Sequence, residues 1–428
     1  MKVDLIETVV GLVPKSWCIQ NLEDISGFIT KGGTPTTYGF DWADEDSGVP
    51  FFRSECVTDN GFNLKGMNFI HADAHRQMNR SEVKPGDLLM TITGNIGRVA
   101  RAPIDFFSAN INQHIARIRI QDGLEVSADY VYQCLKHDGY VTHYRAILTG
   151  QAYPQISLQQ VRETPIPLPT FPEQQKIATI LTAVDDKMDV IARQIEATQG
   201  LKQGLMQTLF SWGVGTQDAA DWPTVPLQEV AEVRTGVAKG KKGLKEPAEL
   251  PYLRVANVQD GHIDLAEVKT IAVEAAQLER YALQPGDVLM TEGGDFDKLG
   301  RGDVWKGQIS PCLHQNHVFA VRPDPSKLNS YYLAALAASD YGRQYFLSCS
   351  KRTTNLASIN SSQLKTFPVL LPPLDEQVRI ADIVAAANAR IETLKTKKAH
   401  YQTLKRGLMQ KLLTGEWRVK LDSLTGTA

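Results

Sequence analysis

The chain contains one long segment twice, and this duplication is the feature that most constrains its fold. The copies run from Glu173 to Phe210 and from Glu376 to Leu413, and matching residues lie 203 positions apart throughout. In each copy, apolar residues recur at alternating spacings of four and three, the heptad pattern of helices that pack along a seam. The opposite side of each copy is polar, so neither stripe can be buried without a partner. The predicted seam consists of Ile177, Leu181, Val184, Met188, Ile191, Ile195, Ile380, Val384, Ile391 and Leu394.

Two packing arrangements satisfy this pattern. The two helices can pack on each other, or each helix can pack on the domain next to it. The first arrangement is simpler. The constant offset also means that neither copy has an insertion relative to the other, so the two helices have the same length. We therefore expect two long helices packed together.

The duplication continues outside the helices. A proline-rich elbow precedes each helix, IPLPTFPEQQ in the first half and VLLPPLDEQ in the second. PGDLLMT matches PGDVLMT, and Arg53 matches Arg254, although the offset drifts because the loops differ in length. The chain is therefore predicted to alternate domain, helix, domain, helix, as a pseudo-twofold molecule. The predicted boundaries are 1–155, 156–213, 214–358 and 359–428.

Within each half, short runs of β-branched and apolar residues are bounded by Gly, Pro, Asn and Asp, which is typical of strands. Examples are VPFFRS, DLLMTI and IARIRI in the first half, and LPYLRV, DVLMT and HVFAVRP in the second. Helical segments follow at 127–135 and 328–338. The predicted fold class is α+β, with two β-rich domains in tandem joined by the two long helices.

Composition limits where such a chain can work. The formal net charge is −2, so any surface that binds nucleic acid must be locally basic. The five scattered cysteines form no C-x-x-C pair, which disfavours a zinc site or a disulfide framework and indicates a reducing cytosol. The N-terminus lacks the apolar core of a signal peptide, and no run of about 18 apolar residues predicts a membrane span. A cytoplasmic location is expected.

Signals for catalysis are weak. The chain has no G-x-x-x-x-G-K-[ST] loop and no Asn/Asp-Pro-Pro-aromatic motif of an amino-methyltransferase. Asp287, Glu292 and Lys298 resemble a nuclease cluster, but the first half lacks the glutamate, which favours a structural role for the shared aspartate. His71 and His75 are one helical turn apart, yet no third ligand is near them, so no metal site is predicted.

Three pairs of loops are better candidates for function. They occupy equivalent places in the two halves: 28–36 and 233–245, 91–98 and 291–301, and 112–118 and 314–321. Gly, Thr and Lys in the first pair suit contacts with phosphate, while Gln and Asn in the third can bind base edges, adenine in particular. A shared scaffold with divergent tips predicts two domains that read different sequences. The candidate DNA-binding residues are Thr30, Lys31, Gly33, Thr34, Arg53, Thr91, Thr93, Asn95, Arg98, Gln113, His114, Thr235, Lys239, Lys241, Lys242, Arg254, Lys298, Arg301, Gln315 and Asn316.

These features together resemble the specificity subunits of type I restriction–modification systems. The resemblance covers nearly the whole chain and is most specific in the two elbows, in the shared LKxGLMQxL helix endings, and in TKGGTP, PGDLLMT and TGNIGRVA. It implies that each domain is a target-recognition domain for one half of a bipartite, asymmetric DNA site. It also implies that the helices form an antiparallel coiled coil that sets the spacer. The second half departs from the pattern at TEGGDFDKLGR, which is longer and more acidic than TITGNIGR.

The resemblance also implies partners. Two methyltransferase (modification) subunits would bind the helices and methylate adenine N6 from S-adenosylmethionine, with the target base flipped out. Restriction subunits would add translocation and cleavage with ATP and Mg²⁺. This chain would be a non-catalytic subunit without a cofactor or metal of its own, with double-stranded DNA as its ligand and no membrane involved. Its near-neutral charge then predicts weak, strongly salt-dependent DNA binding by the isolated chain.

Two other functions stay open at this point. A structural adaptor would use the two domains to bind proteins, and DNA binding by the assembled complex distinguishes it from a specificity subunit. A free-standing methyltransferase is disfavoured by the missing motifs, and failure of the isolated chain to bind S-adenosylmethionine would exclude it.

Overall fold

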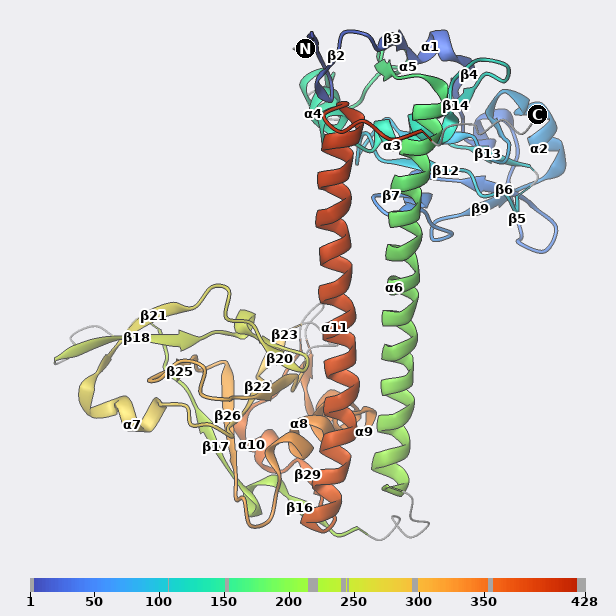
Figure 1. Ribbon diagram of the computed structural model, residues 1–428. Helices are drawn as coiled ribbons and strands as arrows, with labels where there is room; N and C mark the ends of the chain where they lie inside the picture. Colours follow the sequence, from blue (N-terminus) through green and yellow to red (C-terminus); the bar gives the residue numbers. More distant parts are fainter. Residues whose placement is uncertain are drawn as a thin grey trace, which may run out of the picture. The chain divides into compact units, whose positions relative to one another are not determined.

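The computed structural model describes residues 4–421, except for 107, 151–153, 215–221, 240–243, 245, 295–298 and 353–356. The chain divides into two compact units, residues 1–191 with 397–428 and residues 192–396. Each unit contains one β-rich domain and parts of both long helices (Figure 1). No helix in the described part of the chain is both long and apolar enough to cross a membrane.

The first domain is built on two sheets. An antiparallel sheet has the strand order β12 (Val99–Arg101), β11 (Leu88–Thr91), β14 (Ile115–Ile120), β4 (Ser26–Lys31). A second sheet has the order β10 (Glu82–Val83), β13 (Ala109–Ile111), β6 (Val49–Phe52), β9 (Asn68–Ile70), β5 (Trp42–Ala43). All four residues of β11 are buried. Because side chains alternate across a strand, they enter two different cores, one on each face of the sheet. Leu88 and Met90 join a core with helix α3 (Ala128–Leu135), and Leu89 joins a core with the second sheet.

The second domain repeats this arrangement. Its antiparallel sheet has the order β24 (Gly302–Val304), β22 (Val288–Thr291), β26 (Val318–Pro323), β17 (Ala231–Thr235). A smaller sheet has the order β21 (Lys269–Glu274), β18 (Pro247–Leu253), β25 (Leu313–His314). Val288 and Met290 lie in a core with α8 (Ser330–Ala338), and Leu289 lies in another core. The tandem α+β fold predicted from the sequence is confirmed, since each expected strand run and both helical segments form as predicted.

The remaining elements are short. They are β1 (Leu5–Thr8), β2 (Gly11–Pro14), β3 (Cys18–Asn21), α1 (Leu22–Ile25), β7 (Val57–Thr58), β8 (Gly61–Phe62), α2 (Ala72–Gln77), α4 (Asp138–Ala146), α5 (Leu158–Arg162), β15 (Pro165–Leu168), β16 (Thr224–Pro226), β19 (Val258–Gln259), β20 (His262–Ile263), α7 (Leu278–Tyr281), β23 (Gly293–Gly294), α9 (Asp340–Cys349), β27 (Lys351–Arg352), β28 (Ala357–Ser358), α10 (Ser361–Lys365) and β29 (Pro368–Leu370).

A buried aspartate precedes the central strand of each domain. Asp87 accepts two hydrogen bonds from Arg119, both at 2.7 Å, and Asp287 accepts two from Arg322, at 2.7 and 2.8 Å. These bonds to a carboxylate raise the pKa of both arginines. The aspartate shared by the two halves therefore makes the same structural ion pair in both domains, as the sequence comparison predicted.

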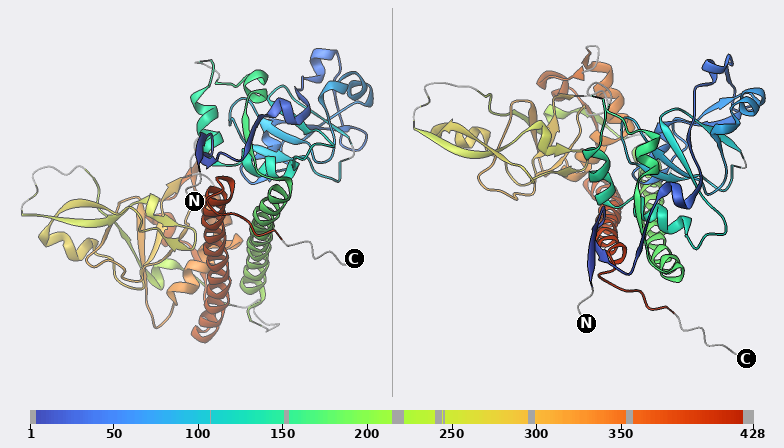
Figure 2. Two further views of the ribbon diagram at one scale, coloured as in Figure 1. Left: turned by 45° about the horizontal axis from the view of Figure 1, so that its top comes forward. Right: turned by 90° about the horizontal axis from the view of Figure 1, so that it is seen from above.

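The long helices are α6 (Phe171–Trp212) and α11 (Leu374–Leu413), which lie side by side in every view (Figures 1 and 2). Of the predicted seam residues, eight are buried, and Met188 and Ile195 are partly buried. In the first unit, Ile177 and Leu181 near the start of α6 share a core with Leu412 near the end of α11. The helices therefore run antiparallel there.

The second unit shows the same pairing with the helices exchanged. Ile380 and Val384, near the start of α11, share a core with Met206 and Leu209, near the end of α6. In both units this core also includes the helix of the adjacent domain, α3 or α8. Both packing arrangements considered from the sequence therefore occur. The first turns of each long helix contact the other long helix and also the adjacent domain.

A buried glutamine explains the Glu-Gln pair that starts each long helix. The Gln174 side chain accepts a hydrogen bond from the Ser127 N–H at 2.9 Å and donates to the Pro169 carbonyl oxygen at 2.9 Å. Gln377 does the same with the Asn329 N–H, at 2.8 Å, and with a proline carbonyl oxygen of its own elbow, at 2.9 Å. Each glutamine therefore attaches the elbow and the helix to the segment that enters α3 or α8.

The neighbouring glutamate binds the segment that leaves the other helix. Glu173 accepts a hydrogen bond from Arg418 Nε at 2.8 Å, and Arg418 lies beyond the end of α11. Glu376 accepts one from the Val214 N–H at 2.5 Å, and Val214 lies beyond the end of α6. In both units, the glutamate at the start of one long helix therefore binds the segment that follows the other, through an arginine side chain in the first unit and a backbone N–H in the second.

One ion pair lies within the helix pair of the first unit. Lys405 Nζ on α11 is 2.6 and 2.7 Å from the two carboxylate oxygens of Asp185 on α6. The lysine side chain is 9% exposed and the aspartate side chain 20%. Burial lowers the pKa of Lys405. The equivalent positions in the second unit are Lys202 and Asn388, so the second unit has an amide where the first has a carboxylate.

Candidate nucleic-acid interface

The three predicted loops of the first domain meet around one cleft with a volume of about 1120 Å³. The loops follow β4, follow β11, and connect β13 to β14, so the strand order of the sheets brings them to one side. Eight candidate residues line the cleft: Thr34, Arg53, Thr91, Thr93, Asn95, Arg98, Gln113 and His114. Residues far apart in the sequence but predicted to share one function therefore lie together.

A chain of hydrogen-bonded side chains connects these loops. The Thr34 hydroxyl donates to Gln113 Oε1 at 3.0 Å, and Gln113 Nε2 is 3.1 Å from His114 Nε2. His114 Nδ1 is 2.7 Å from the Thr93 hydroxyl. This chain fixes the positions of amide, imidazole and hydroxyl groups in the cleft before a ligand arrives, which lowers the ordering cost of binding.

Glycine in the first loop is required by the protein itself. A Cβ on Gly32 would lie 1.6 Å from the Ile111 carbonyl oxygen, and one on Gly236 in the second domain would lie 2.0 Å from the His314 carbonyl oxygen. Gly33 packs against the Tyr38 ring, 3.0 Å from the position of its Cβ. These glycines therefore allow the loop to approach the neighbouring strand, which explains why both halves have them irrespective of any contact with phosphate.

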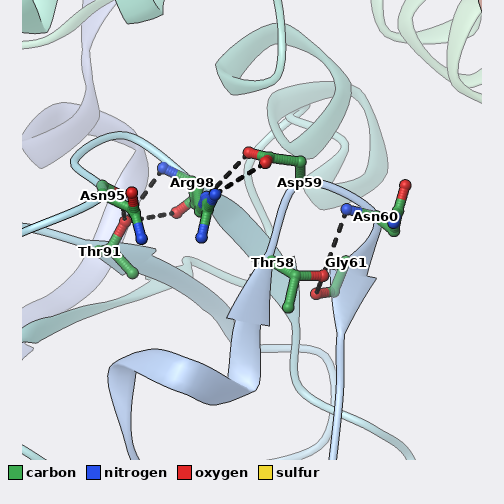
Figure 3. A network of polar contacts seen from close by, with 7 residues as sticks. All are labelled: Thr58, Asp59, Asn60, Gly61, Thr91, Asn95 and Arg98. Atoms are coloured by element: carbon green, nitrogen blue, oxygen red, sulfur yellow. Dashed lines mark hydrogen bonds and ion pairs between the residues drawn. The ribbon is translucent and has the colours of Figure 1, made fainter. Parts of the chain in front are cut away.

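Arg98 is held from two sides (Figure 3). The buried Thr91 hydroxyl accepts a hydrogen bond from the Arg98 N–H at 3.1 Å and donates to the Asn95 carbonyl oxygen, which fixes the turn that leads to Arg98. The guanidinium group donates through Nε and Nη2 to both carboxylate oxygens of Asp59, each at 2.9 Å. Asp59 lies in the turn between β7 and β8.

The other arginine of the cleft is paired as well. Arg53 Nη2 donates to Glu55 Oε1 at 2.9 Å. Glu55 also lines the cleft, which contains no further Lys, Arg, Asp or Glu side chain among the described residues. Both cationic groups of the cleft are therefore neutralised by carboxylates from the same domain.

Besides Gly33, two candidates of the first domain lie outside this lining. Lys31, at the end of β4, is exposed. Thr30 is 6% exposed, and its hydroxyl donates to the Lys31 carbonyl oxygen at 3.3 Å. Thr30 and the buried Thr91 can thus support the loops, while Lys31 is free to meet a ligand.

The candidates of the second domain occupy corresponding places. Thr235 and Lys239 are exposed at and after the end of β17, and Arg301 precedes β24. Arg254 donates to the Glu267 carbonyl oxygen at 3.3 Å and lies 3.5 Å from its carboxylate. Gln315 and Asn316 are partly buried in the turn between β25 and β26. Lys241, Lys242 and Lys298 lie outside the described residues.

The sequence analysis selected His114 but not its counterpart in the second domain, His317. His114 and His317 occupy the same position before β14 and β26, and each carbonyl oxygen accepts a backbone hydrogen bond from the loop after the central strand. His317 Nδ1 is 2.5 Å from Glu292 Oε2, whereas His114 faces Thr93. The two histidines are 203 positions apart, as in the helices, so aligning these loops at that offset would have found the pair.

The structure also adds residues that were not among the candidates, although Asn112 lies in one of the predicted loops. Trp42, Asn68, Asn112 and Gln155 line the cleft of the first domain. Trp42 is 41% exposed and its ring contacts Phe51 edge-on, with 5.2 Å between centroids. These residues come from separate segments, and only the fold brings them together.

One of the two histidines considered as metal ligands, His75, has other partners. His75 Nδ1 is 2.6 Å from Asn110 Oδ1, and its Nε2 is 3.0 Å from the Ser108 hydroxyl. Across the described ranges, no three His, Cys, Asp or Glu side chains form a group that could hold a metal ion. His75 therefore belongs to a structural hydrogen-bond network.

Comparison with known proteins identifies the family. A family model described as "Type I restriction modification DNA specificity domain" matches the chain twice, at residues 14–198 and 219–400. The chain is 22% identical to the putative type I restriction enzyme MjaX specificity subunit of Methanocaldococcus jannaschii, over 97% of this chain and 96% of the relative. It is 20% identical to the type I restriction enzyme EcoKI specificity subunit of Escherichia coli K12, over 97% of this chain and 93% of the relative.

Solved structures support the same fold. The S subunit of a type I restriction–modification system from M. genitalium matches with a TM-score of 0.57 at 15% identity, over 93% of this chain and 96% of that one. A chain from a study of assembly and conformational transition of the type I R-M system matches with a TM-score of 0.55 at 19% identity, over 95% and 99%. The two matches of the family model cover most of both halves of the sequence. The chain therefore belongs to the family of type I restriction–modification specificity subunits and carries two tandem DNA specificity domains.

Proposed function

We propose that this chain is the non-catalytic DNA-reading subunit of a type I complex, in which each domain reads one half of a bipartite, asymmetric site. The recognition domains are residues 1–155 and 214–358, and the connecting regions are 156–213 and 359–428. The observation that carries the proposal is the cleft of the first domain. It gathers arginine, amide, imidazole and hydroxyl groups from three loops, the groups that bind phosphates and base edges.

The helices are proposed to set the spacer between the half-sites. Each is continuous, through 42 residues in α6 and 40 in α11. B-DNA repeats about every 10 base pairs, so two readers need a defined separation to meet the same face of the duplex. Packed helices provide such a separation, and a flexible linker does not.

The helix endings support two copies of one partner. Leu201 and Leu404 occupy the same position in LKxGLMQxL and are 62% and 48% exposed. One turn further along the same face, Gly204 and Gly407 have open space where a Cβ would stand. An exposed leucine beside a helical glycine allows a partner helix to approach closely, and the same face occurs on both helices. We assign this face to two modification subunits, which would methylate adenine N6 from S-adenosylmethionine. Restriction subunits using ATP and Mg²⁺ would complete the complex, in the cytoplasm.

Methylation mapping tests the proposal. The chain is co-expressed with the modification subunit of its own system, and host DNA is sequenced for N6-methyladenine. The expected result is a bipartite motif with a fixed gap. Replacing Lys31 and Arg98 by alanine should relax or abolish recognition in one half only, while the exposed basic residues Lys65 and Arg80 of the same domain serve as the matched control pair.

The test also separates the proposal from an adaptor function. A stable complex that leaves host DNA unmodified and does not bind duplex DNA would favour two protein-binding domains instead. Loss of both half-sites upon the Lys31 and Arg98 replacements would contradict the assignment of one domain to one half.

A further inference from the structure

The cleft of the first domain contains arginines but little net charge. Arg53 and Arg98 line it, and each is paired with a carboxylate, Glu55 or Asp59, at 2.9 Å. The carboxylate is the more exposed member of both pairs, at 52% for Glu55 and 74% for Asp59, against 40% and 31% for the arginines. A surface intended only to attract phosphate would not carry these acidic groups at its edge.

The Asp59 pair occupies one of the two edges of the Arg98 guanidinium group that can donate a pair of N–H groups. An arginine grips a phosphate or a guanine edge through two parallel N–H groups. Asp59 takes Nε and Nη2 of Arg98 in this geometry, with one carboxylate oxygen on each (Figure 3). A phosphate that takes this edge of the guanidinium group must therefore displace Asp59, whereas the Asp59 pair does not use the N–H groups of Nη1.

The position of Asp59 is fixed by its own hairpin. The Thr58 hydroxyl donates to the Gly61 carbonyl oxygen at 2.8 Å and accepts from the Asn60 N–H at 3.3 Å. Gly61 has a φ of +107°, which a residue with a side chain rarely adopts. This turn directs Asp59 at Arg98, while Thr91 fixes Arg98 from the other side.

We propose that Asp59 is a specificity-determining residue of the first domain, because its carboxylate occupies the Nε–Nη2 edge of Arg98, balances its charge and suppresses binding to non-cognate DNA. On a random duplex, a phosphate gains the Nε–Nη2 edge of Arg98 only by releasing a carboxylate beside the DNA. A phosphate at Nη1 meets a guanidinium group whose charge Asp59 already balances, so in both cases the net attraction is small. On a cognate half-site, contacts from the rest of the cleft offset that loss. The discrimination comes from an unfavourable element rather than from an added contact. This inference rests on the proposed DNA-reading function.

The test compares DNA binding by the full chain in complex with its modification subunits. Fluorescence anisotropy is measured at several salt concentrations with a random duplex and with a duplex that carries the motif found by methylation mapping. Asp59→Asn should raise affinity for the random duplex roughly two- to fivefold, the range set by the strength of exposed ion pairs. The slope of log affinity against log salt should steepen by up to about 0.9, the value of one additional phosphate contact. Affinity for the cognate duplex should rise less, so the specificity ratio falls.

Three further variants isolate the mechanism. Asp59→Glu keeps the charge and should keep the wild-type ratio. Asp73→Asn removes an exposed carboxylate that is paired with Arg76 in the same domain but does not line the cleft, and it should change nothing. In an Arg98→Gln background, Asp59→Asn should lose its effect, because no guanidinium group remains for Asp59 to neutralise.

Two results would overturn the inference. One is unchanged or reduced affinity of Asp59→Asn for the random duplex, with an unchanged melting temperature, which would make Asp59 a support for Arg98. The other is an effect of equal size in the Arg98→Gln background, which would reduce it to bulk charge. If the parent complex does not prefer the mapped motif over the random duplex, the proposed function itself fails, and this outcome is recognised without any variant.

Discussion

Replacing Lys405 by methionine should destabilise the first unit by about 2–3 kcal/mol. Lys405 donates to both carboxylate oxygens of Asp185 at 2.6 and 2.7 Å, and its side chain is only 9% exposed. Removing one member of a buried pair costs about 3–5 kcal/mol, because the other charge stays buried without compensation. Asp185 keeps a hydrogen bond from Gln133 Nε2 at 2.9 Å and is 20% exposed, so we expect a loss below that range. Methionine retains the apolar packing of the lysine stem.

The second unit provides the matched control. Lys202 holds the equivalent position, faces Asn388 instead of an aspartate, and has no ion pair among the described residues. Burial lowers its pKa, so its charge is disfavoured where it stands. Lys202→Met should therefore be neutral or slightly stabilising. A double replacement, Lys405→Met with Asp185→Leu, should recover most of the loss, since apolar residues can replace a buried ion pair without cost.

Hydrogen exchange measured by mass spectrometry is the suitable assay, because it reports the two units separately. Peptides from the first half of α6 and the last turns of α11 should lose protection in Lys405→Met, and urea unfolding of the full chain should show the corresponding shift. A loss below about 1 kcal/mol, or an equal loss in Lys202→Met, would refute the view that this pair is a buried and locally specific contact. Failure of the double replacement to recover stability would point to lost packing instead.

Three other predictions follow from the same structure. Burial lowers the pKa of His137, whose Nδ1 accepts a hydrogen bond from the Gly139 N–H at 3.0 Å. The stability that neutral His137 contributes should therefore be complete above the unfolded pKa of about 6.5 and fall as the pH drops toward the lowered folded pKa. His137→Asn, which can still cap α4, should show a smaller difference in the free energy of unfolding between pH 7 and pH 5. Gln174→Ala should cost about 2–4 kcal/mol in thermal or urea unfolding, because the Ser127 N–H and the Pro169 carbonyl oxygen lose their buried partner, and Gln174→Glu should not restore it, since a carboxylate cannot donate to the carbonyl oxygen. One heptad added within either long helix should lengthen the gap of the methylated motif and leave the bases of each half unchanged; changed half-sites with an unchanged gap would contradict the role of the helices.

The sequence predicted the parts of this fold that repeat. Ile177 and Ile380 occupy equivalent positions in a heptad stripe, and both are buried. A stripe with this period lies on one face of a helix, so its residues are buried together when that face packs on a partner. The strands could be predicted in the same way, since Leu88 and Val288 lie in the matching runs PGDLLMT and PGDVLMT, each with a Pro-Gly turn before the strand. Duplication supplied a second observation of each element, which a single domain would not have provided.

The sequence predicted the chemistry of the cleft only in part. Thr34, Arg98 and Gln113 could be assigned to one surface because their loops recur in both halves, and they line one cleft. The pairing of Arg98 with Asp59 could not be predicted, because 39 residues separate them and the contact depends on how two turns pack. Local sequence reports which groups are available, while the partner of each group is decided by tertiary structure.

The contacts made beyond the two long helices have a topological consequence. Arg418, after α11, reaches Glu173, and Val214, after α6, reaches Glu376. The tail also lies against the N-terminal segment, since a Cβ on Gly415 would be 2.8 Å from the Pro14 ring. Each unit therefore attaches the start of one long helix to the segment that follows the other helix. Because Glu173 and Arg418 come from different halves of the sequence, as do Val214 and Glu376, separating the halves would break both contacts, and neither half of the sequence contains a whole unit.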